Sequence, residues 1–140
     1  RGNGGGTRSG MEGEPVLFGG FLIGRIAKVF NDTASVKTLF DPTWQSAVRI
    51  GKNGIDALLV GGNRPRLTLI DKQARSAPAD SVYSAAKDFP YGLPVGEVKN
   101  FYLSGDRLFQ EGDINFPYQL IDIRVVVVAK NNENQELSNQ

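Results

Sequence analysis

Alternating apolar and polar positions recur along the chain in short segments separated by turns. The last of these segments, residues 120–129, is the strongest, because its apolar side chains fall at every second position, namely Ile121, Ile123, Val125 and Val127. A period of two is that of a β-strand, and no segment longer than about ten residues carries the 3.6-residue apolar period of an amphipathic helix. The pattern therefore predicts an all-β fold of about nine short antiparallel strands.

Glycine, proline and asparagine mark the turns between these segments. Residues 19–20 are a Gly-Gly pair of the two-residue hairpin type, and residues 51–54 end in an Asn-Gly pair that adopts positive φ at low cost. Many short strands at intervals of about 8–15 residues favour a small barrel or sandwich. Residues 105–113 are predicted to be a loop or a single helical turn. The expected strands before the last one cover residues 14–18, 21–30, 35–40, 47–50, 55–60, 67–71, 80–84 and 95–101.

A Gly-Gly-Asn-Arg-Pro break at residues 61–65 marks the expected boundary inside the chain. It predicts two small β-barrel-like lobes, one on either side of it. The strand at 120–129 could belong to either lobe, and the sequence leaves this open. The expected organisation is a flexible glycine-rich start at 1–13, a first β lobe at 14–62, a second β lobe at 63–129 and a polar tail at 130–140.

The composition excludes several kinds of enzyme site. The chain has 140 residues, with 16 Lys and Arg against 15 Asp and Glu, and it contains no histidine and no cysteine. Thiol nucleophiles, disulfides, zinc hydrolase centres and Ser-His-Asp triads all need one of these two residue types. We therefore expect no catalytic residue, no metal and no cofactor. The net charge is +1 and the densest basic run, residues 64–75, holds four cations, so we also expect no nucleic-acid binding.

One four-residue motif has the spacing of a catalytic site. Ser84-Ala85-Ala86-Lys87 fits the S-x-x-K pattern of penicillin-recognising serine enzymes, in which a helix brings the lysine close to the serine hydroxyl. The sequence has no K-T-G partner motif, and the strand and proline signals around the motif argue against a helix. A strand end followed by a loop is the favoured interpretation. A small serine hydrolase using Ser84 and Lys87 is the alternative function.

Residues 89–94, Phe-Pro-Tyr-Gly-Leu-Pro, place three large apolar side chains in a loop that two prolines stiffen. These side chains either plug the end of a barrel or contact a partner, and the sequence leaves both open. Aromatic side chains lead among interface anchors. As a hypothesis, the partner-binding residues are Phe89, Tyr91 and Leu93 as a first contact, and Phe101 and Tyr102 as a second.

Trp44, the only tryptophan, follows the turn sequence Asp41-Pro42-Thr43. We expect it to be a packing anchor across that turn, since a tryptophan side chain is mostly apolar. If it were exposed instead, Trp44 and Tyr91 could form a peptidoglycan-binding module, which is a further alternative function.

Several blocks of sequence follow one another in an order that matches a known family. They are residues 10–16 (GMEGEPV), 19–26 (GGFLIGRI), 33–37 (TASVK), 39–42 (LFDP), 54–61 (GIDALLVG) and 89–98 (FPYGLPVGEV). Together they resemble the bacterial rod shape-determining protein MreC family, across roughly residues 10–100. Residues 79–80 and 83–85 depart from the family's Gly-Asp and Thr-Ser-Gly, so we expect a different loop shape at 80–88.

The resemblance implies a fold and a function. It implies a scaffold on the extracytoplasmic (periplasmic) face of the bacterial inner membrane, with a single-pass anchor and a coiled coil before two small β-barrel lobes. The anchor and coiled coil are not in this chain, which we therefore expect to be a fragment. The resemblance further implies self-association as a homodimer or higher assembly, and binding to the elongation-specific penicillin-binding protein and other elongasome membrane proteins. It brings no catalytic residues.

Overall fold

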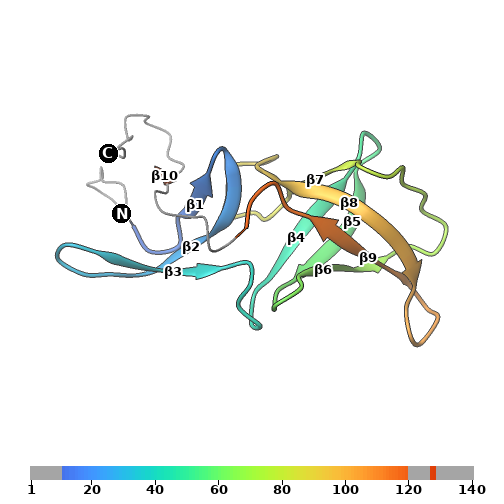
Figure 1. Ribbon diagram of the computed structural model, residues 1–140, viewed down its shortest axis with the longest axis horizontal. Coiled ribbons are helices and arrows are strands. Elements are labelled where there is room, and N and C mark those ends of the chain that lie inside the picture. The colour runs from blue at the N-terminus through green and yellow to red at the C-terminus, as the bar shows by residue number, and fades with distance from the viewer. Residues whose placement is uncertain (1–10, 120–126, 129–140) are drawn as a thin grey trace.

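The computed structural model describes residues 11–119 and 127–128 of the chain. These residues contain ten β-strands and no helix (Figure 1), which confirms the all-β prediction. The strands are β1 (Pro15–Phe18), β2 (Phe21–Val29), β3 (Ala34–Thr38), β4 (Gln45–Ile50), β5 (Ile55–Val60), β6 (Arg66–Ile70), β7 (Ser81–Ser84), β8 (Pro94–Leu103), β9 (Gln110–Asn115) and β10 (Val127–Val128).

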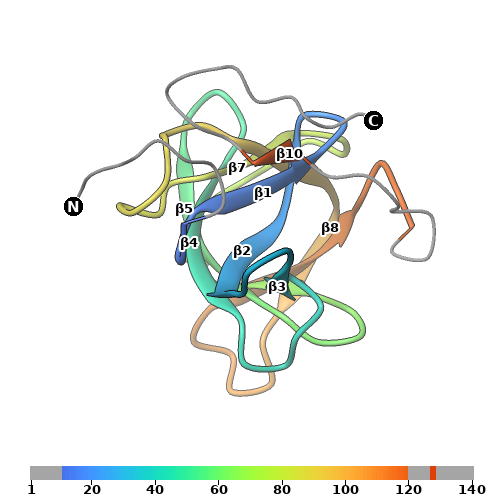
Figure 2. The same ribbon diagram turned by 90° about the vertical axis from the view of Figure 1, so that its left-hand side faces the viewer.

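The strands form two units, an open sheet and a closed barrel. The sheet has the strand order β10-β1-β2-β3, and the barrel closes in the order β4-β5-β6-β9-β8-β7. Every pairing within them is antiparallel, as predicted. The sheet lies at one end of an elongated molecule and the barrel at the other (Figure 1), and a view along the long axis shows the sheet in front of the barrel (Figure 2).

The boundary between the units is not at residues 61–65, where the sequence placed it. β5 and β6 pair directly across that loop, so the segment is a hairpin turn inside the barrel. Gly61 is there because of close packing: a Cβ on it would overlap the carbonyl oxygens of Leu39 and Asp41. The predicted boundary is therefore wrong, and the two units separate between β3 and β4, at residues 39–44.

The last strand returns to the open sheet. β10 pairs with β1, with Val128 opposite Val16 and Val127 opposite Leu17. This resolves the assignment that the sequence left open. The remainder of the predicted strand at 120–129 lies outside the described residues, as do the first ten residues of the predicted flexible start and the predicted tail at 130–140.

The segment at 105–113, which the sequence predicts as a loop or helical turn, is a turn over residues 105–109 and then continues into β9. This strand pairs with β8 on one side and with β6 on the other. β9 was not predicted as a strand because polar side chains and Gly112 stand where an alternating strand would have apolar side chains. Gly112 lies opposite Phe101 and leaves room for that aromatic ring on the barrel.

Of the two hydrophobic cores in the described part of the chain, the larger joins the two units; the smaller one consists of Val16, Ile23 and Ile26 on β1 and β2. The barrel interior is filled by buried side chains from all six of its strands. Two leucines from outside the barrel strands, Leu22 on β2 and Leu39 in the segment that connects the units, belong to the same cluster. Both leucines are fully buried. Burial of one leucine side chain stabilises a fold by about 1.5–3 kcal/mol, so these two alone attach the sheet firmly to the barrel.

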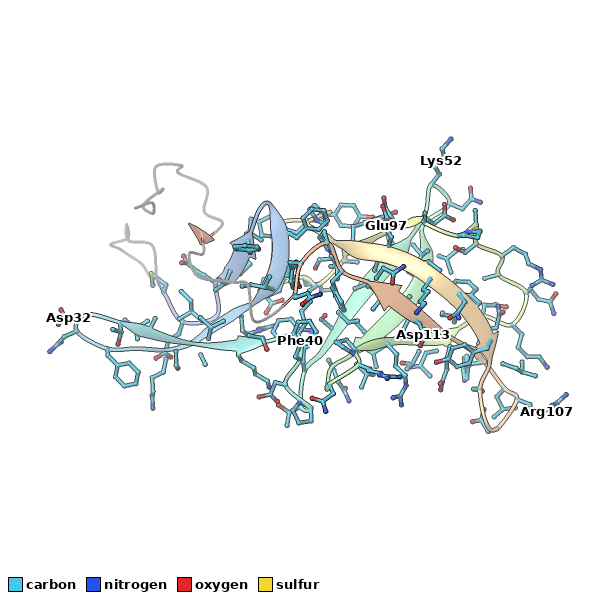
Figure 3. The ribbon with its side chains drawn as sticks, in the orientation of Figure 1. Asp32, Phe40, Lys52, Glu97, Arg107 and Asp113 are labelled. Atoms are coloured by element: carbon cyan, nitrogen blue, oxygen red, sulfur yellow. The ribbon has the colours of Figure 1, made fainter. Side chains whose placement is uncertain are left out.

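Aromatic side chains extend this attachment. The ring centres of Phe40 and Phe116 are 5.2 Å apart. The ring centre of Tyr118 lies 5.7 Å from that of Phe116 and 6.1 Å from that of Phe18 on β1. Burial raises the pKa of the Tyr118 hydroxyl far above its usual range. The sheet thus covers one end of the barrel, and the β8–β9 turn marks the opposite end (Figure 3).

Among the described residues, no helix is long and apolar enough to cross a membrane.

Candidate functional site

The first predicted contact, the loop around Phe89, divides into a buried part and an exposed part. Phe89 is only 6% exposed and belongs to the main core, and Leu93 is half-buried against the same core. Tyr91 between them is 64% exposed. Phe89 therefore fills part of the barrel core and is not accessible to a partner, whereas the Tyr91 side chain is accessible from solvent.

The exposed Tyr91 belongs to an ordered cluster on the barrel wall, which we call the tyrosine cluster: Arg49, Tyr83 and Tyr91. Arg49 donates a hydrogen bond from Nη1 to the Tyr91 hydroxyl at 3.2 Å, and its guanidinium lies 5.8 Å from the centre of that ring. The rings of Tyr83 and Tyr91 meet edge to face, with 6.0 Å between their centres. The hydroxyl of Tyr83 in turn donates to the carbonyl of Gly51.

Strand pairing produces this cluster. Arg49 on β4 lies opposite Asp56 on β5 and opposite Tyr83 on β7. Its Nε donates to the Asp56 carboxylate at 3.0 Å, which holds the long side chain in one orientation. The hydrogen bonds to Tyr91 and Asp56 raise the pKa of Arg49, and burial raises the pKa of Tyr83. The cluster therefore presents a fixed guanidinium beside two tyrosine rings.

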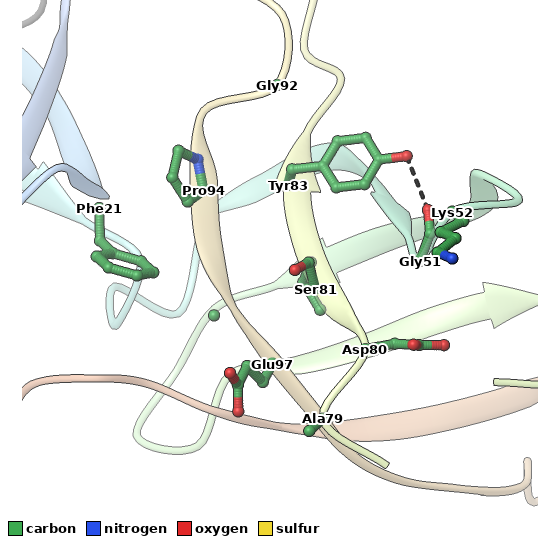
Figure 4. A pocket seen from close by; sticks show the side chains of 12 residues that line it. Phe21, Gly51, Lys52, Ala79, Asp80, Ser81, Tyr83, Gly92, Pro94 and Glu97 are labelled. Atoms are coloured by element: carbon green, nitrogen blue, oxygen red, sulfur yellow. Dashed lines mark hydrogen bonds between the residues drawn. The ribbon is translucent and has the colours of Figure 1, made fainter. Parts of the chain in front are cut away.

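A shallow groove of about 660 Å³ adjoins the tyrosine cluster on β7 and β8 (Figure 4). Tyr83 belongs to both, and Phe21 and Pro94 form the apolar part of the groove wall. Charged side chains of both signs, Lys52, Asp80 and Glu97, also line it, and glycines at three further positions keep it open. It is an open surface groove whose wall combines apolar side chains with charges of both signs.

The second predicted contact lies on β8. Phe101 is half-buried and packs against the main core, while Tyr102 is exposed and its hydroxyl donates to the Asp113 carboxylate at 3.1 Å. Burial, and then this hydrogen bond, raise the pKa of Tyr102. Only Tyr102 of this pair faces outward, and the structure does not bring it into the tyrosine cluster.

A group of exposed apolar residues at the far end of the barrel was not predicted from the sequence. Leu69 on β6, Leu103 on β8, and Leu108 and Phe109 in the β8–β9 turn are all exposed. Leu108 and Phe109 could have been found from the sequence, because they are two adjacent apolar residues in an otherwise polar turn. Leu69 gave no such signal, because a period of two places it on the buried face with Leu67.

The two alternative sites lack the required geometry. Ser84 is completely buried at the end of β7, where its Oγ accepts a hydrogen bond from the Ala86 N–H. Residues 85–88 form no helix that would bring Lys87 to this hydroxyl.

Trp44 is only 2% exposed and its Nε1 donates to Ser46 Oγ, so the prediction of a packing anchor is confirmed. In the part of the chain that the structure describes, no group of acidic side chains is arranged to hold a metal ion.

Comparison with known proteins agrees with this architecture. The model of the family "Rod shape-determining protein MreC, barrel core" matches residues 3–130. The chain belongs to the MreC family. The family resemblance seen in the sequence is thereby confirmed. No curated protein matches the chain significantly.

Solved structures of MreC proteins share the fold. MreC from Pseudomonas aeruginosa is 27% identical, with a TM-score of 0.74 over 86% of this chain and 81% of that one. The major periplasmic domain of the cell shape-determining filament MreC is 22% identical, with a TM-score of 0.64 over 77% and 71%. MreC in its complex with penicillin-binding protein PBP2 from Helicobacter pylori is 14% identical, with a TM-score of 0.62 over 81% and 73%. The last two show likeness of fold alone.

Proposed function

We propose that this chain is a non-catalytic scaffold domain of the cell-wall elongation machinery, which maintains rod shape by binding a peptidoglycan transpeptidase and by self-association. Membership of the MreC family supports this role. A structural relative forms a complex with a penicillin-binding protein, and another is a periplasmic domain, so the same partner class and compartment are proposed here. Single-pass anchoring in the inner membrane and contacts with other elongasome membrane proteins complete the proposal.

The tyrosine cluster is the proposed transpeptidase contact, and the exposure of Tyr91 is the observation that carries it. Tyrosine and arginine are enriched among residues that dominate binding energy. Because Arg49 already fixes the ring of Tyr91, little side-chain entropy is lost when a partner covers it. The adjoining groove, with Phe21 and Pro94, offers space for an apolar side chain of the partner.

The test is a calorimetric titration of the chain against the extracytoplasmic part of an elongation transpeptidase from the same organism. Tyr91→Ala is expected to weaken binding about tenfold or more, equivalent to about 1.4 kcal/mol. Its melting temperature should change little, because the ring is exposed. Phe30→Ala, an equally exposed aromatic on the distant β2–β3 hairpin, is the matched control and should bind normally.

Other results would change the assignment. If Tyr102→Ala weakens binding and Tyr91→Ala does not, the contact lies on β8 and the tyrosine cluster is not the site. If the unmodified chain does not bind the transpeptidase at any concentration tested, that part of the proposed function is wrong.

A further inference from the structure

The end of the barrel farthest from the open sheet carries a protruding turn beside a hollow. The turn presents Leu108, which is 65% exposed, next to Arg107. The hollow has a volume of about 830 Å³, and its apolar wall is formed by Ile55, Leu69 and Ala74 together with Leu108 and Phe109 of the turn itself. We call the turn and the hollow together the outer surface. Figure 3 places Arg107 at this end of the molecule and Asp32 at the opposite end.

The hollow is shaped by hydrogen bonds from the Gln110 side chain and by an unusual conformation of Leu69. The Leu69 φ is +57°, a value that leucine rarely adopts, and it coincides with a register shift between β6 and β9. The shift directs Leu69 outward, so it is 54% exposed. Gln110 Nε2 donates to the carbonyls of Asp71 and Ala74 at 3.0 and 2.9 Å, which fixes the loop on the other side of the hollow.

The protruding turn is equally ordered. Asp106 accepts hydrogen bonds from the Ser104 hydroxyl at 2.6 Å and from the Leu108 N–H at 3.0 Å. These bonds lower the pKa of Asp106, so its carboxylate is ionised at neutral pH. Arg107 beside it has a φ of +64°, and Leu108 follows at the exposed edge. Strained backbone conformations of this kind concentrate at active sites, ligand clamps and switch regions.

The charges of the turn match those of the hollow. Arg107 stands beside the exposed leucine of the turn, and Asp71 lines the hollow beside Leu69, as does Asp56, whose carboxylate also accepts from Arg49. Conversely, the turn carries Asp106 and the hollow carries Lys72. The turn of one molecule therefore carries an apolar side chain and charges that the side chains of the hollow in an identical molecule can pair with. Exposed carboxylates on both parts disfavour an anionic lipid surface as the occupant.

We propose that the outer surface is the contact through which two copies of this chain associate. The protruding turn and the hollow adjoin on one surface, so a two-fold axis places Leu108 of each copy in the hollow of the other. Arg107 of one copy then meets the acidic side chains of the partner hollow. This inference rests on the self-association in the proposed function and names its surface and symmetry.

Sedimentation equilibrium over about 1 µM to 1 mM of the 140-residue chain tests the proposal. We expect a reversible dimer. Leu108→Asp should weaken dimerisation at least tenfold, because it puts a carboxylate into an apolar, acid-lined hollow. Arg107→Asp keeps the apolar contact and should also weaken it, since aspartate tolerates positive φ and reverses the charge. Phe30→Asp, on the distant hairpin, is the matched control and should leave the dimer intact.

Three results would overturn the proposal: a monomer throughout the concentration range, a dimer that Leu108→Asp leaves unchanged, or a monomer that sediments with phosphatidylglycerol vesicles until Leu108 is replaced. The last would assign the surface to lipid. The transpeptidase titration separates this inference from the rest of the proposed function. Leu108→Asp should bind the transpeptidase normally, and failure of transpeptidase binding with an intact dimer would leave the outer surface assigned.

Discussion

Arg25 on β2 donates a 2.8 Å hydrogen bond from Nη1 to the carboxylate of Asp88, which lies 63 positions later in the chain. The same guanidinium lies 4.7 Å from the centre of the Phe89 ring and 5.1 Å from that of Trp44. One side chain of the open sheet thus joins an acid and two aromatic rings of the barrel. The barrel loop that carries Tyr91 is anchored by this contact at its first residues.

Replacing Arg25 should therefore destabilise the junction between sheet and barrel. Arg25→Ala removes two cation–π contacts and the packing of the side-chain stem, so we expect a loss of about 1–3 kcal/mol in the free energy of unfolding. Asp88→Asn removes only an exposed ion pair and should cost at most about 1 kcal/mol. Urea denaturation of both variants measures the difference. Equal losses would mean that the ion pair, and not the rings, holds the junction.

Phe89 and Tyr91 should differ sharply although they are two residues apart. Phe89→Ala empties part of the main core and is expected to cost about 3–5 kcal/mol in the free energy of unfolding. Tyr91→Ala removes an exposed ring and should cost less than about 1 kcal/mol. Thermal and urea denaturation compare the two, and a large loss for Tyr91→Ala would show that the tyrosine cluster has a structural role.

Gly61 should be intolerant of a side chain. In Gly61→Ala the new methyl group would overlap the carbonyl oxygens of Leu39 and Asp41, so the junction would have to shift, at an expected cost of about 2 kcal/mol or more. Gly105 has open space around it, and Gly105→Ala should change stability by less than about 0.5 kcal/mol. Melting temperatures of the two alanine variants give the comparison. A stable Gly61→Ala would contradict the close packing seen there.

Tyr118 should make the fold sensitive to alkaline pH. Burial raises the pKa of its hydroxyl in the folded state above the unfolded value of about 10. Below that pH the hydroxyl is protonated in both states, and above it the unfolded chain ionises first, so stability falls as pH rises. Urea denaturation between about pH 8 and 11 should show a smaller fall for Tyr118→Phe than for the unmodified chain. An identical fall in both would exclude Tyr118 as the cause.

A fluorescent β-lactam should not label the chain. Ser84 is completely buried, and its hydroxyl already accepts a backbone hydrogen bond. Gel fluorescence after incubation with the label is the measurement, and Ser84→Ala is its control. Covalent labelling that disappears in Ser84→Ala would establish the serine hydrolase alternative instead.

The strand content could be predicted because it depends on local pattern. Alternation and turn residues identified most strands, and the order of blocks identified the family. The division into units could not be predicted in the same way. A glycine-rich break such as residues 61–65 suits a linker and a hairpin turn equally well. Which one it forms depends on the distant strands that β5 and β6 join.

Burial of individual side chains was equally beyond local pattern. Leu67 and Leu69 are two residues apart and would lie on the same face of a regular strand. The register shift nevertheless leaves Leu67 buried and Leu69 exposed. Phe89 and Phe109 both follow polar turns, but Arg25 and the core cover only the first. The tyrosine cluster likewise forms because β4 pairs with β7, which places Tyr83 beside Arg49, and because the loop after β7 brings Tyr91 to the same arginine. Such contacts arise from tertiary structure.

The pairing of β1 with β10 also determines how the molecule can be attached to a solid support. The first and last described strands are neighbours in the open sheet, at the end of the molecule opposite Arg107 (Figures 1 and 3). A tag joined through either strand would hold the sheet toward the support and direct the barrel away from it. Immobilisation at one terminus should therefore leave Tyr91 and Leu108 accessible to molecules in solution.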